Sequence, residues 1–523
     1  MSEYIFGANI LENLTTGMYQ DSRVIYREYI QNACDQIDKA INQGLLVKNE
    51  AVIEINIDKE KRIILIEDNA TGIKAEDFIK VLGNIADSDK KLGESKGFRG
   101  IGRLCGLAYC KILKFQAKYK GEKVISVMMC DAEKMRALIQ ESESGKKYSA
   151  QEVLDRIYSF SQEQVSNDEI NSHWFKVEMI NINDENVDLL DFLGVKNYLA
   201  FNAPVPYQNS FTYRSEIYNY IKANNFKLDE YNIFINSEQI FKKYDTHHKT
   251  SKGDDQIIDL KFQEFYDDNK NLVAWSWIGI SCFKAVIDKD CLMRGIRLRK
   301  DNIQIGNQDT LQRFFREERG GHYFIGEIFC VSPDLIPNSQ RDYFNENFVR
   351  FEFEKQLRNY FEYLHKLYYA GSEISSDFKK IDEAAKKMSE HEARIKAGYF
   401  VNDAQREQAA ENLDKLKSDA EKAEARIERK KNLNNEIAIR IIEQYEKEPQ
   451  ENKSEDKDKN NKNENEIKLD LKQEPKIKYR ADRLSSYSKA ERKLISKIYD
   501  IIFNSIDAGT AEMLISKIEA ELK

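Results

Sequence analysis

The spacing of apolar residues changes several times along the chain, and each change predicts a different kind of element. Residues 27–38 place apolar side chains at helical spacing, which predicts a helix. The β-branched run Ile63–Ile66 leads into Asp68–Gly72, which predicts a strand that enters a turn. Alternating residues such as Gly295–Arg299 predict further strands within residues 273–305. Helices and strands mixed in this way predict an α+β fold class.

A different pattern begins near residue 373. Apolar positions there follow heptad spacing, which is typical of helices packed along a seam: Leu413, Leu416, Ala420, Ala423 and Ile427. A weaker seam lies upstream, at Ile381, Ala385, Met388 and Ile395. The interruption from Gly398 to Asp403 indicates two antiparallel helices or a hinge. A dimerising coiled coil and an intramolecular helical hairpin both fit residues 373–446.

Residues 447–480 consist mostly of Lys, Glu, Asn and Asp, so they cannot offset the entropy of ordering and are predicted to be a disordered linker. A small helical segment, 481–523, follows. Ser488–Glu491 reads as an N-capping box, a stripe of Leu and Ile comes next, and Ala508-Gly509 breaks it. We expect this helical pair to dock on a partner or on a second copy, because it exposes more apolar surface than it can bury alone.

Composition narrows the class of function. The net charge of −8 gives no overall attraction to nucleic acid. We interpret the basic cluster of Arg294, Arg297, Arg299 and Lys300 as the solvated face of a strand, with a phosphate- or nucleic-acid-contacting edge as the alternative. The seven cysteines include no Cys-x-x-Cys pair, so we expect reduced thiols and a cytoplasmic location. No apolar run of about 18 residues occurs, so no membrane partner is expected.

Three motifs carry candidate chemistry. Glu28, Asn32 and Asp35 fall at i, i+4 and i+7, so a helix would place them on one face. Such a strip facing a core needs a polar ligand, and a hydrated metal ion with phosphate oxygens would satisfy it. A solvent-facing helix with chance spacing is the alternative. Asp68, at a strand end, could accept a hydrogen bond from an exocyclic amine, and Gly72 would let the backbone approach a flat ring; an ordinary hairpin turn is the alternative there.

The third motif is the glycine-rich segment from Lys96 to Arg103, which precedes a predicted helix start at Leu104–Tyr109. Backbone N–H groups in such a segment can point at phosphates, and a helix dipole adds to the attraction. No Gly-Lys-Ser/Thr follows, so this is not a Walker A motif. No strand immediately precedes it, which argues against a dinucleotide-binding fingerprint.

Taken in order, the three motifs resemble the GHKL (Bergerat-fold) ATPases, and most closely the ninety-kilodalton heat-shock chaperones. Leu82–Ser88 resembles the chaperones' lid segment. Leu335–Asp342 resembles their middle-domain Leu-Pro-Leu-Asn-x-Ser-Arg-Glu loop. The resemblance covers roughly residues 1–370, with close matches confined to the motifs.

The resemblance implies roles for the matching residues. Glu28 would be the general base that orients the attacking water, Asn32 would hold Mg²⁺, and Asp35 would support the nucleotide pocket. Arg341 would reach the γ-phosphate of ATP from the second domain, as an arginine finger does. The segment that would wrap the phosphates is Gly97, Phe98, Arg99, Gly100, Ile101 and Gly102.

The same resemblance places Asp68 on the adenine amine and Gly72 beneath the ring. Two nearby positions depart from the family pattern. Ala70 stands where the family usually has the first Gly of Asp-x-Gly-x-Gly. Phe175, in the strand Trp174–Glu178, replaces the Thr of the family's Gly-Thr-x-Val. Both departures bear on nucleotide affinity more than on the fold, and they leave the base and the metal ligand in place.

The resemblance also implies an order of domains. Residues 1–200 would form a Bergerat-fold α/β sandwich, the ATPase domain, with helices on one face of a mixed sheet and an acidic, helical insert near 131–170. Residues 201–372 would form an α/β transducer domain of the S5-like type. Residues 373–446 would be the coiled coil, 447–480 the linker and 481–523 the terminal helical segment.

The implied activity is that of an ATP-gated conformational clamp, a homodimer that hydrolyses ATP with Mg²⁺. Its client would be a protein, as for a chaperone, or nucleic acid together with a partner effector, as in microrchidia-like and antiviral defence ATPases. The alternative is a nucleotide-binding interaction module with weak or no turnover.

Overall fold

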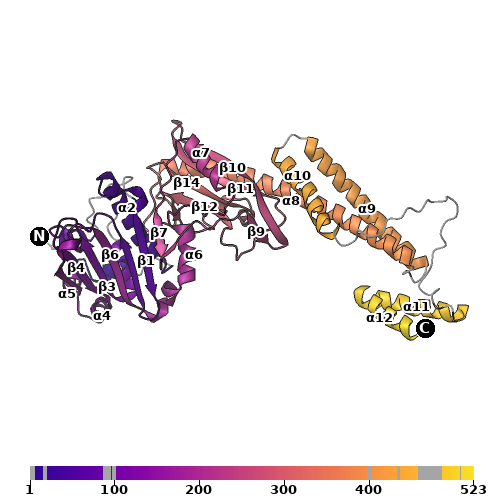
Figure 1. Cartoon of the computed structure of the whole chain (residues 1–523), viewed down its shortest axis with the longest axis horizontal. Coiled ribbons are helices and arrows are strands. Elements are labelled where there is room, and N and C mark those ends of the chain that lie inside the picture. The colour runs from indigo at the N-terminus through magenta and orange to yellow at the C-terminus, as the bar shows by residue number, and fades with distance from the viewer. Residues whose placement is uncertain are drawn as a thin grey trace. The chain divides into compact units, whose positions relative to one another are not determined.

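Figure 1 shows the computed structural model of the chain, which describes residues 6–15, 21–85, 96, 102–397, 400, 403–432, 436–457, 484, 486–506 and 508–522. The chain divides into two compact units. The first comprises residues 1–280 and 286–365, and the second comprises residues 281–285 and 366–523. Helices and strands occur together in the first unit, so the fold class is α+β, as predicted.

The first unit contains a mixed sheet of eight strands: β1 (Val52–Asp58), β2 (Ile63–Asp68), β3 (Cys110–Lys118), β4 (Val124–Asp131), β5 (Tyr158–Gln164), β6 (Trp174–Ile182), β7 (Asn232–Ile235) and β8 (Glu238–Gln239). Their order is β5-β4-β3-β6-β2-β1-β7-β8. Neighbouring strands pair antiparallel, except that β1 and β7 run parallel. The sheet therefore takes its last two strands from beyond residue 200.

One face of this sheet is apolar and the other is polar. Alternate residues of β2, such as Ile64 and Ile66, are buried in the core, as strand geometry requires. The opposite face carries cross-strand ion pairs, among them Lys176 Nζ to Glu67 Oε2 at 3.1 Å. The helices of this region are α1 (Asn9–Thr15), α2 (Val24–Asn42), α3 (Phe78–Gly83), α4 (Ala132–Glu143), α5 (Ala150–Ile157) and α6 (Phe192–Asn202). Helix α2 contacts β2, and α4 contacts β3.

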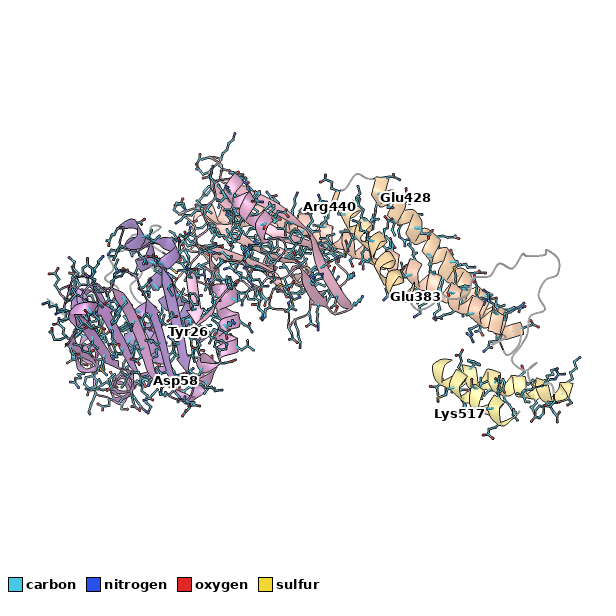
Figure 2. All side chains as sticks on the ribbon, in the orientation of Figure 1. Tyr26, Asp58, Glu383, Glu428, Arg440 and Lys517 are labelled. Atoms are coloured by element: carbon cyan, nitrogen blue, oxygen red, sulfur yellow. The ribbon has the colours of Figure 1, made fainter. Side chains whose placement is uncertain are left out.

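The position of α2 is fixed by its buried side. Tyr26, labelled in Figure 2, is fully buried, and its hydroxyl donates to the carbonyl of Leu189 at 2.6 Å. The helical insert predicted near 131–170 consists of α4 and α5, followed by the edge strand β5. Ser149 and Glu152 form a capping box at the start of α5, which explains where that helix begins.

A second sheet has six strands: β9 (His247–Thr250), β10 (Gly253–Tyr266), β11 (Leu272–Ser281), β12 (Gly295–Lys300), β13 (Ile303–Ile305) and β14 (Ile325–Cys330). Their order is β13-β12-β14-β11-β10-β9, with β12 and β14 parallel. The strands predicted within 273–305 are β11, β12 and β13. Helix α7 is Arg214–Ala223, and α8 (Phe348–Ala397) begins against this sheet, where Phe353 lies 5.6 Å from Phe265 between ring centroids.

The interpretation of the basic cluster as a solvated strand face is wrong. Strand β12 lies between β13 and β14, and each of its residues is buried. Arg299 is fully buried and pairs with Glu327, Lys300 Nζ donates to the carbonyl of Ser332 at 2.7 Å, and Arg297 is 4% exposed. Alternation in the sequence identified the strand but could not show that both faces are covered. These three side chains do not form an accessible phosphate-contacting edge either, because they lie inside the protein.

The second unit is helical, and contains the rest of α8 with α9 (Asp403–Asn432), α10 (Glu436–Lys457), α11 (Lys489–Ser505) and α12 (Ala508–Glu521). The predicted interruption separates α8 from α9. Ion pairs join Asp377 to Arg426 at 2.6 Å and Glu373 to Lys430 at 2.9 Å. Since one series of residue numbers falls as the other rises, α8 and α9 are antiparallel.

The heptad seam of α9 packs within the chain. Leu416 is half-buried, and the other four residues are each at most 9% exposed: Leu413, Ala420, Ala423 and Ile427. Of the two alternatives, the structure therefore has the intramolecular packing. The weaker upstream seam is wrong, because Ala385, Met388 and Ile395 are exposed and Ala384 is buried instead. Exposed charged residues, such as Glu383 and Glu428, cover the outside of the hairpin (Figure 2).

Helix α10 continues to Lys457, so it includes residues 447–457 of the predicted linker. Glu, Lys and Gln are good helix formers and can extend a helix that has already started. Residues 458–480 of the predicted linker lie outside the described residues, as do residues 481–483 of the terminal helical segment. The predicted capping box of Ser488 and Glu491 starts α11. Apolar side chains remain exposed on α11 and α12, as expected: Leu494, Ile498, Ile501, Met513 and Leu514. Among the described residues, no helix has both the length and the apolar character needed to cross a bilayer.

Candidate nucleotide-binding site

Helix α2 carries Glu28, Asn32 and Asp35 on one face, as the spacing predicts, and all three are half-buried. Its other faces bury apolar residues such as Ile30 and Ile37 in the core of the first sheet. The polar strip therefore lies on a helix that the core holds firmly. Oxygen atoms of two carboxylates and one amide are available along it.

Gly102 brings the end of the glycine-rich segment against this strip. A Cβ atom on Gly102 would lie 2.6 Å from Oε2 of Glu28, so only glycine leaves the carboxylate where it is. Residues Gly102–Ala108 form a 3₁₀ helix and the chain then enters β3, so the helix predicted to start at Leu104–Tyr109 is a short 3₁₀ helix that ends at Ala108. Gly97, Phe98, Arg99, Gly100 and Ile101 lie outside the described residues, as do residues 86–88 of the lid-like segment.

Arg341 reaches α2 from the loop that follows the second sheet. Its Nη1 donates to Oε1 of Gln31 at 2.7 Å and to the carbonyl of Lys96 at 2.9 Å. The side chain is buried, and its Nε and Nη2 atoms have no hydrogen-bond partner among the described residues. Burial and the neighbouring Arg27 guanidinium lower the pKa of Arg341 to about 10, so it stays charged at neutral pH.

The backbone of Arg341 is also unusual. Its φ of 55° lies in the left-handed region, which non-glycine residues rarely adopt and which recurs at functional sites. Beside it, the carbonyl of Gln340 lies 3.4 Å from Nη2 of Arg27, and the same Nη2 lies 3.1 Å from Oε1 of Glu28. The loop thus meets α2 at Gln31 and Arg27, and Arg27 in turn contacts the predicted base, Glu28.

Asp68 stands at the end of β2 and is 4% exposed. Its Oδ1 accepts a hydrogen bond from the backbone N–H of Ala70 at 3.1 Å. Burial raises the pKa of the Asp68 carboxyl from 3.8 to about 7, against the opposing effect of that hydrogen bond. Phe175 lies directly opposite Asp68 in the β2–β6 register, so the substituted strand position does adjoin the predicted adenine contact.

Gly72 has a structural reason of its own to be glycine. Its φ is +64°, and a Cβ atom there would lie 2.0 Å from the carbonyl oxygen of Lys118. The turn therefore packs against β3 in a way that excludes any side chain. Its predicted place beneath an adenine ring stays a prediction. The preceding residue, Thr71, donates to Oε1 of Gln36 on α2 at 3.0 Å, which ties this turn to the helix.

Comparison with known proteins relates the residues of this site to a protein family. Residues 21–162 match the family of histidine kinase-, DNA gyrase B- and HSP90-like ATPases. These residues are a GHKL-type ATPase domain. The matched range contains α2, the turn after β2 and Gly102, which are the elements assembled above.

Relatives that match a short stretch of this chain include chaperone proteins. The chaperone protein HtpG of Methylibium petroleiphilum is 36% identical over 85 residues, covering 15% of this chain and 14% of the relative. HtpG of Campylobacter jejuni is 35% identical over 88 residues, covering 16% and 14%. An endoplasmin homolog of Catharanthus roseus is 34% identical over 91 residues, covering 16% and 11%. The chain thus matches only about a seventh of the length of the HtpG proteins.

The oxygen donors of α2 fit a magnesium ion. Mg²⁺ in phosphate-handling sites is usually held by one or two protein oxygens together with phosphates and water. Asn32 and the half-buried carboxylates beside it supply such oxygens. No cluster of three or more His, Cys, Asp or Glu suited to a metal occurs among the described residues, and a site completed by phosphates needs none.

The sequence reasoning missed the surroundings of Lys96. Its ammonium pairs with Asp38 of α2 and with Asp229, which precedes β7. The only signal was that Asp38 extends the polar strip of α2 by one further turn. Asp229 lies too far along the sequence for any spacing rule to connect it to Lys96.

Proposed function

We propose that this protein binds ATP with Mg²⁺ in the ATPase domain and hydrolyses it, as an ATP-gated clamp. Glu28 acts as general base on the attacking water, Asn32 holds the metal, and Asp68 reads the adenine amine. Gly72 and Asp35 shape the nucleotide pocket, and the segment Gly97–Gly102 holds the phosphates. Phosphoryl transfer needs positioning and charge neutralisation more than covalent chemistry, and these residue types supply both.

One observation carries the proposal. Arg341 comes from beyond the second sheet, lies buried beside α2 and has two donors without partners among the described residues. A buried guanidinium with donors to spare suits an anion, and phosphate oxygens accept such bonds in parallel. We propose that Arg341 contacts the γ-phosphate, so that the position of the second sheet depends on whether ATP is intact.

We further propose that residues 201–372 act as the transducer domain and that the working form is a cytoplasmic homodimer. The similarity to chaperone proteins of the HtpG type favours a protein client. The burial of the basic strand β12 removes one reason to expect a nucleic acid client. All seven cysteines are free thiols, which suits a reducing compartment.

A second candidate function is a nucleotide-binding interaction module with little or no turnover. The observation in its favour is that Nη2 of Arg27 lies 3.1 Å from Oε1 of Glu28, so one of the two oxygens that a general base would offer to water is already engaged. The departures at Ala70 and Phe175 point the same way. Measurements of ATP turnover and of ATP binding distinguish the ATP-hydrolysing clamp from the interaction module.

The test is a steady-state ATP turnover assay, with ATP affinity from titration calorimetry. Glu28→Ala should lower the rate by about 10²–10⁴-fold, the usual share of a general base, while ATP still binds. Glu60→Gln, an exposed carboxylate in the β1–β2 turn, is the control and should leave both unchanged. Turnover by Glu28→Ala at the wild-type rate would remove Glu28 as the base. Tight binding without turnover in the wild type would favour the interaction module.

A further inference from the structure

The polar groups of Lys96, the residue before Gly97, are held by α2 together with two other segments of the first unit. Its N–H donates to Oδ1 of Asp35 at 2.8 Å. Its carbonyl accepts from Nη1 of Arg341 at 2.9 Å and from Nε2 of Gln31. The backbone of this one residue therefore connects α2 with the loop of Arg341.

The side chain of Lys96 makes a separate connection. The ammonium is only 6% exposed and lies 2.6 Å from Oδ2 of Asp38 and 3.2 Å from Oδ2 of Asp229. It also lies 5.3 Å from the ring centroid of Tyr231, whose hydroxyl donates to Asp38. Burial by itself lowers the pKa of Lys96, but the Asp229 and Asp38 carboxylates raise it above the ordinary value, so the side chain stays charged.

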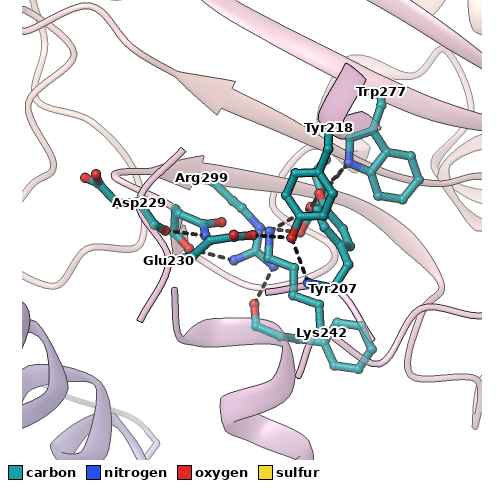
Figure 3. A network of polar contacts seen from close by, with 10 residues as sticks. Tyr207, Tyr218, Asp229, Glu230, Lys242, Trp277 and Arg299 are labelled. Carbon is teal, nitrogen blue, oxygen red and sulfur yellow. Dashed lines mark hydrogen bonds and ion pairs between the residues drawn. The ribbon is translucent and has the colours of Figure 1, made fainter. Parts of the chain in front are cut away.

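Asp229 continues this connection into the second sheet. Its carbonyl accepts from Nδ2 of Asn302 at 2.7 Å, and the carbonyl of Asn302 accepts from Nη1 of Arg299 at 3.0 Å. Arg299 in turn contacts Glu327, which lies 3.0 Å from Nζ of Lys242 (Figure 3). These last three side chains are fully buried, so they hold their geometry firmly.

We propose that Lys96 is a positioning residue that fixes the start of the glycine-rich segment to the second sheet through Asp229, so that ATP binding and the placement of Arg341 are coupled. The inference rests on the proposed function. Lys96 need not touch ATP, because it acts through Asp35, which its N–H contacts, and through Arg341, which contacts its carbonyl. A purely structural ion pair would affect folding alone, whereas a positioning pair affects KM and kcat in folded protein.

Lys227 offers a matched control. Its ammonium lies 3.1 Å from Oδ1 of the same Asp229 carboxylate, but its side chain is 81% exposed. Removing it takes away a surface pair, which contributes little. Lys96→Met keeps the length of the side chain and removes the charge, Lys96→Arg keeps the charge, and Asp229→Asn removes the other partner.

The experiment measures kcat, KM and ATP affinity on the full chain, at a temperature where circular dichroism shows every variant folded. Lys96→Met and Asp229→Asn should each raise KM and lower kcat by roughly tenfold, the size typical of coupled buried groups. The double variant should be no worse than either single variant. Lys96→Arg should recover most of the loss, and Lys227→Met should stay within about twofold of wild type.

The outcomes separate this inference from the function on which it rests. If the wild type neither binds nor hydrolyses ATP, the proposed function fails and the inference fails with it. If the wild type turns ATP over while folded Lys96→Met and Asp229→Asn match it in kcat and KM, only the inference is overturned. Strictly additive losses in the double variant also overturn it. If Lys96→Met does not fold, Asp229→Asn and Lys96→Arg decide by the same criteria.

Discussion

At the scale of single residues, the proposed chemistry depends on where the carboxylate of Glu28 lies, and Gly102 limits that position. The Cβ of an alanine at 102 would lie 2.6 Å from Oε2 of Glu28. Because that oxygen ends a flexible side chain, we expect Gly102→Ala to fold and to push the carboxylate aside. Turnover should fall by about 10²-fold with ATP affinity little changed, since small displacements of a catalytic group have effects of that size. Stopped-flow or steady-state turnover measures the rate.

Gly7→Ala is the control for that substitution, because a Cβ atom at Gly7 meets nothing within 4 Å. It should leave the rate unchanged. Gly102→Ala with a normal rate would mean that the Glu28 carboxylate does not act from the position seen here.

Asp68 predicts a pH dependence of ATP binding. Its folded pKa is about 7, against 3.8 ordinarily, so the free protein holds a proton there below pH 7. The ionised carboxylate accepts from the adenine amine more strongly than the protonated carboxyl does, so ATP affinity should rise with pH up to about 7 and then level off, by at most about tenfold per pH unit below the pKa. Calorimetric titrations with ATP at several values from pH 5.5 to about 8 measure this dependence of affinity on pH.

The reference for that series is Asp68→Asn, which cannot ionise and should bind more weakly with a flat profile once the ionisation of ATP itself is subtracted. The raised pKa of Asp68 also makes the free energy of unfolding depend on pH. Between about pH 4 and 7 the unfolded state is ionised at this site while the folded state is protonated, so raising the pH through this window lowers the free energy of unfolding. A wild-type profile identical to that of Asp68→Asn would contradict the role of Asp68.

At the scale of elements, the helical unit makes a prediction about α9. Leu413 is 9% exposed and lies in the seam that packs within the chain. Leu413→Ala should lower the free energy of unfolding of this unit by about 2 kcal/mol, the lower end for a buried leucine, and leave the oligomeric state unchanged. Thermal unfolding and sedimentation velocity measure the two quantities. Leu494→Ala, 60% exposed on α11, is the control for stability. Dissociation of an oligomer by Leu413→Ala would show that the seam serves a second copy.

Elements differ in how far the sequence could predict them. Helix α2 and its polar strip followed from spacing alone, because Glu28, Asn32 and Asp35 share one face of any helix. The burial of β12 did not follow, since Arg299 is polar by type and its buried position is tolerable because it pairs with Glu327, 28 residues away in the sequence. The upstream seam failed for a related reason: Ala384 and Ala385 are equivalent by composition, and only packing against other helices selects one of them.

The residues of the candidate site also differ in how far the sequence could predict them. The residues of local motifs, such as Asp68 and Gly102, were found by their neighbours in the sequence. Lys96 and Asp229 were not, because their ion pair joins segments that only the folded chain brings together. Arg341 lies between these cases: a resemblance in its loop pointed to it, and the contact with Gln31, 310 residues away, is a property of the fold.

At the scale of the whole molecule, the proposal that ATP closes a clamp is tested through Arg341. Arg341→Ala should lower turnover far more than ATP affinity, because the guanidinium acts on the transferred phosphate, and arginine fingers contribute about 10³–10⁵-fold where they are fully engaged. It should also weaken any ATP-dependent protection of residues 201–372 from limited proteolysis, since the second sheet would no longer respond to the γ-phosphate.

Two further variants test whether the paired donors of Arg341 are what matters. Arg341→Lys keeps the charge but not the paired donors, so it should recover little. Arg319→Ala, which removes an arginine with 61% exposure from the same compact unit, is the control. If Arg341→Ala folds, binds ATP, turns it over at the normal rate and shows the normal protease pattern, the second sheet does not complete the active site, and the clamp has to be driven by contacts other than this one.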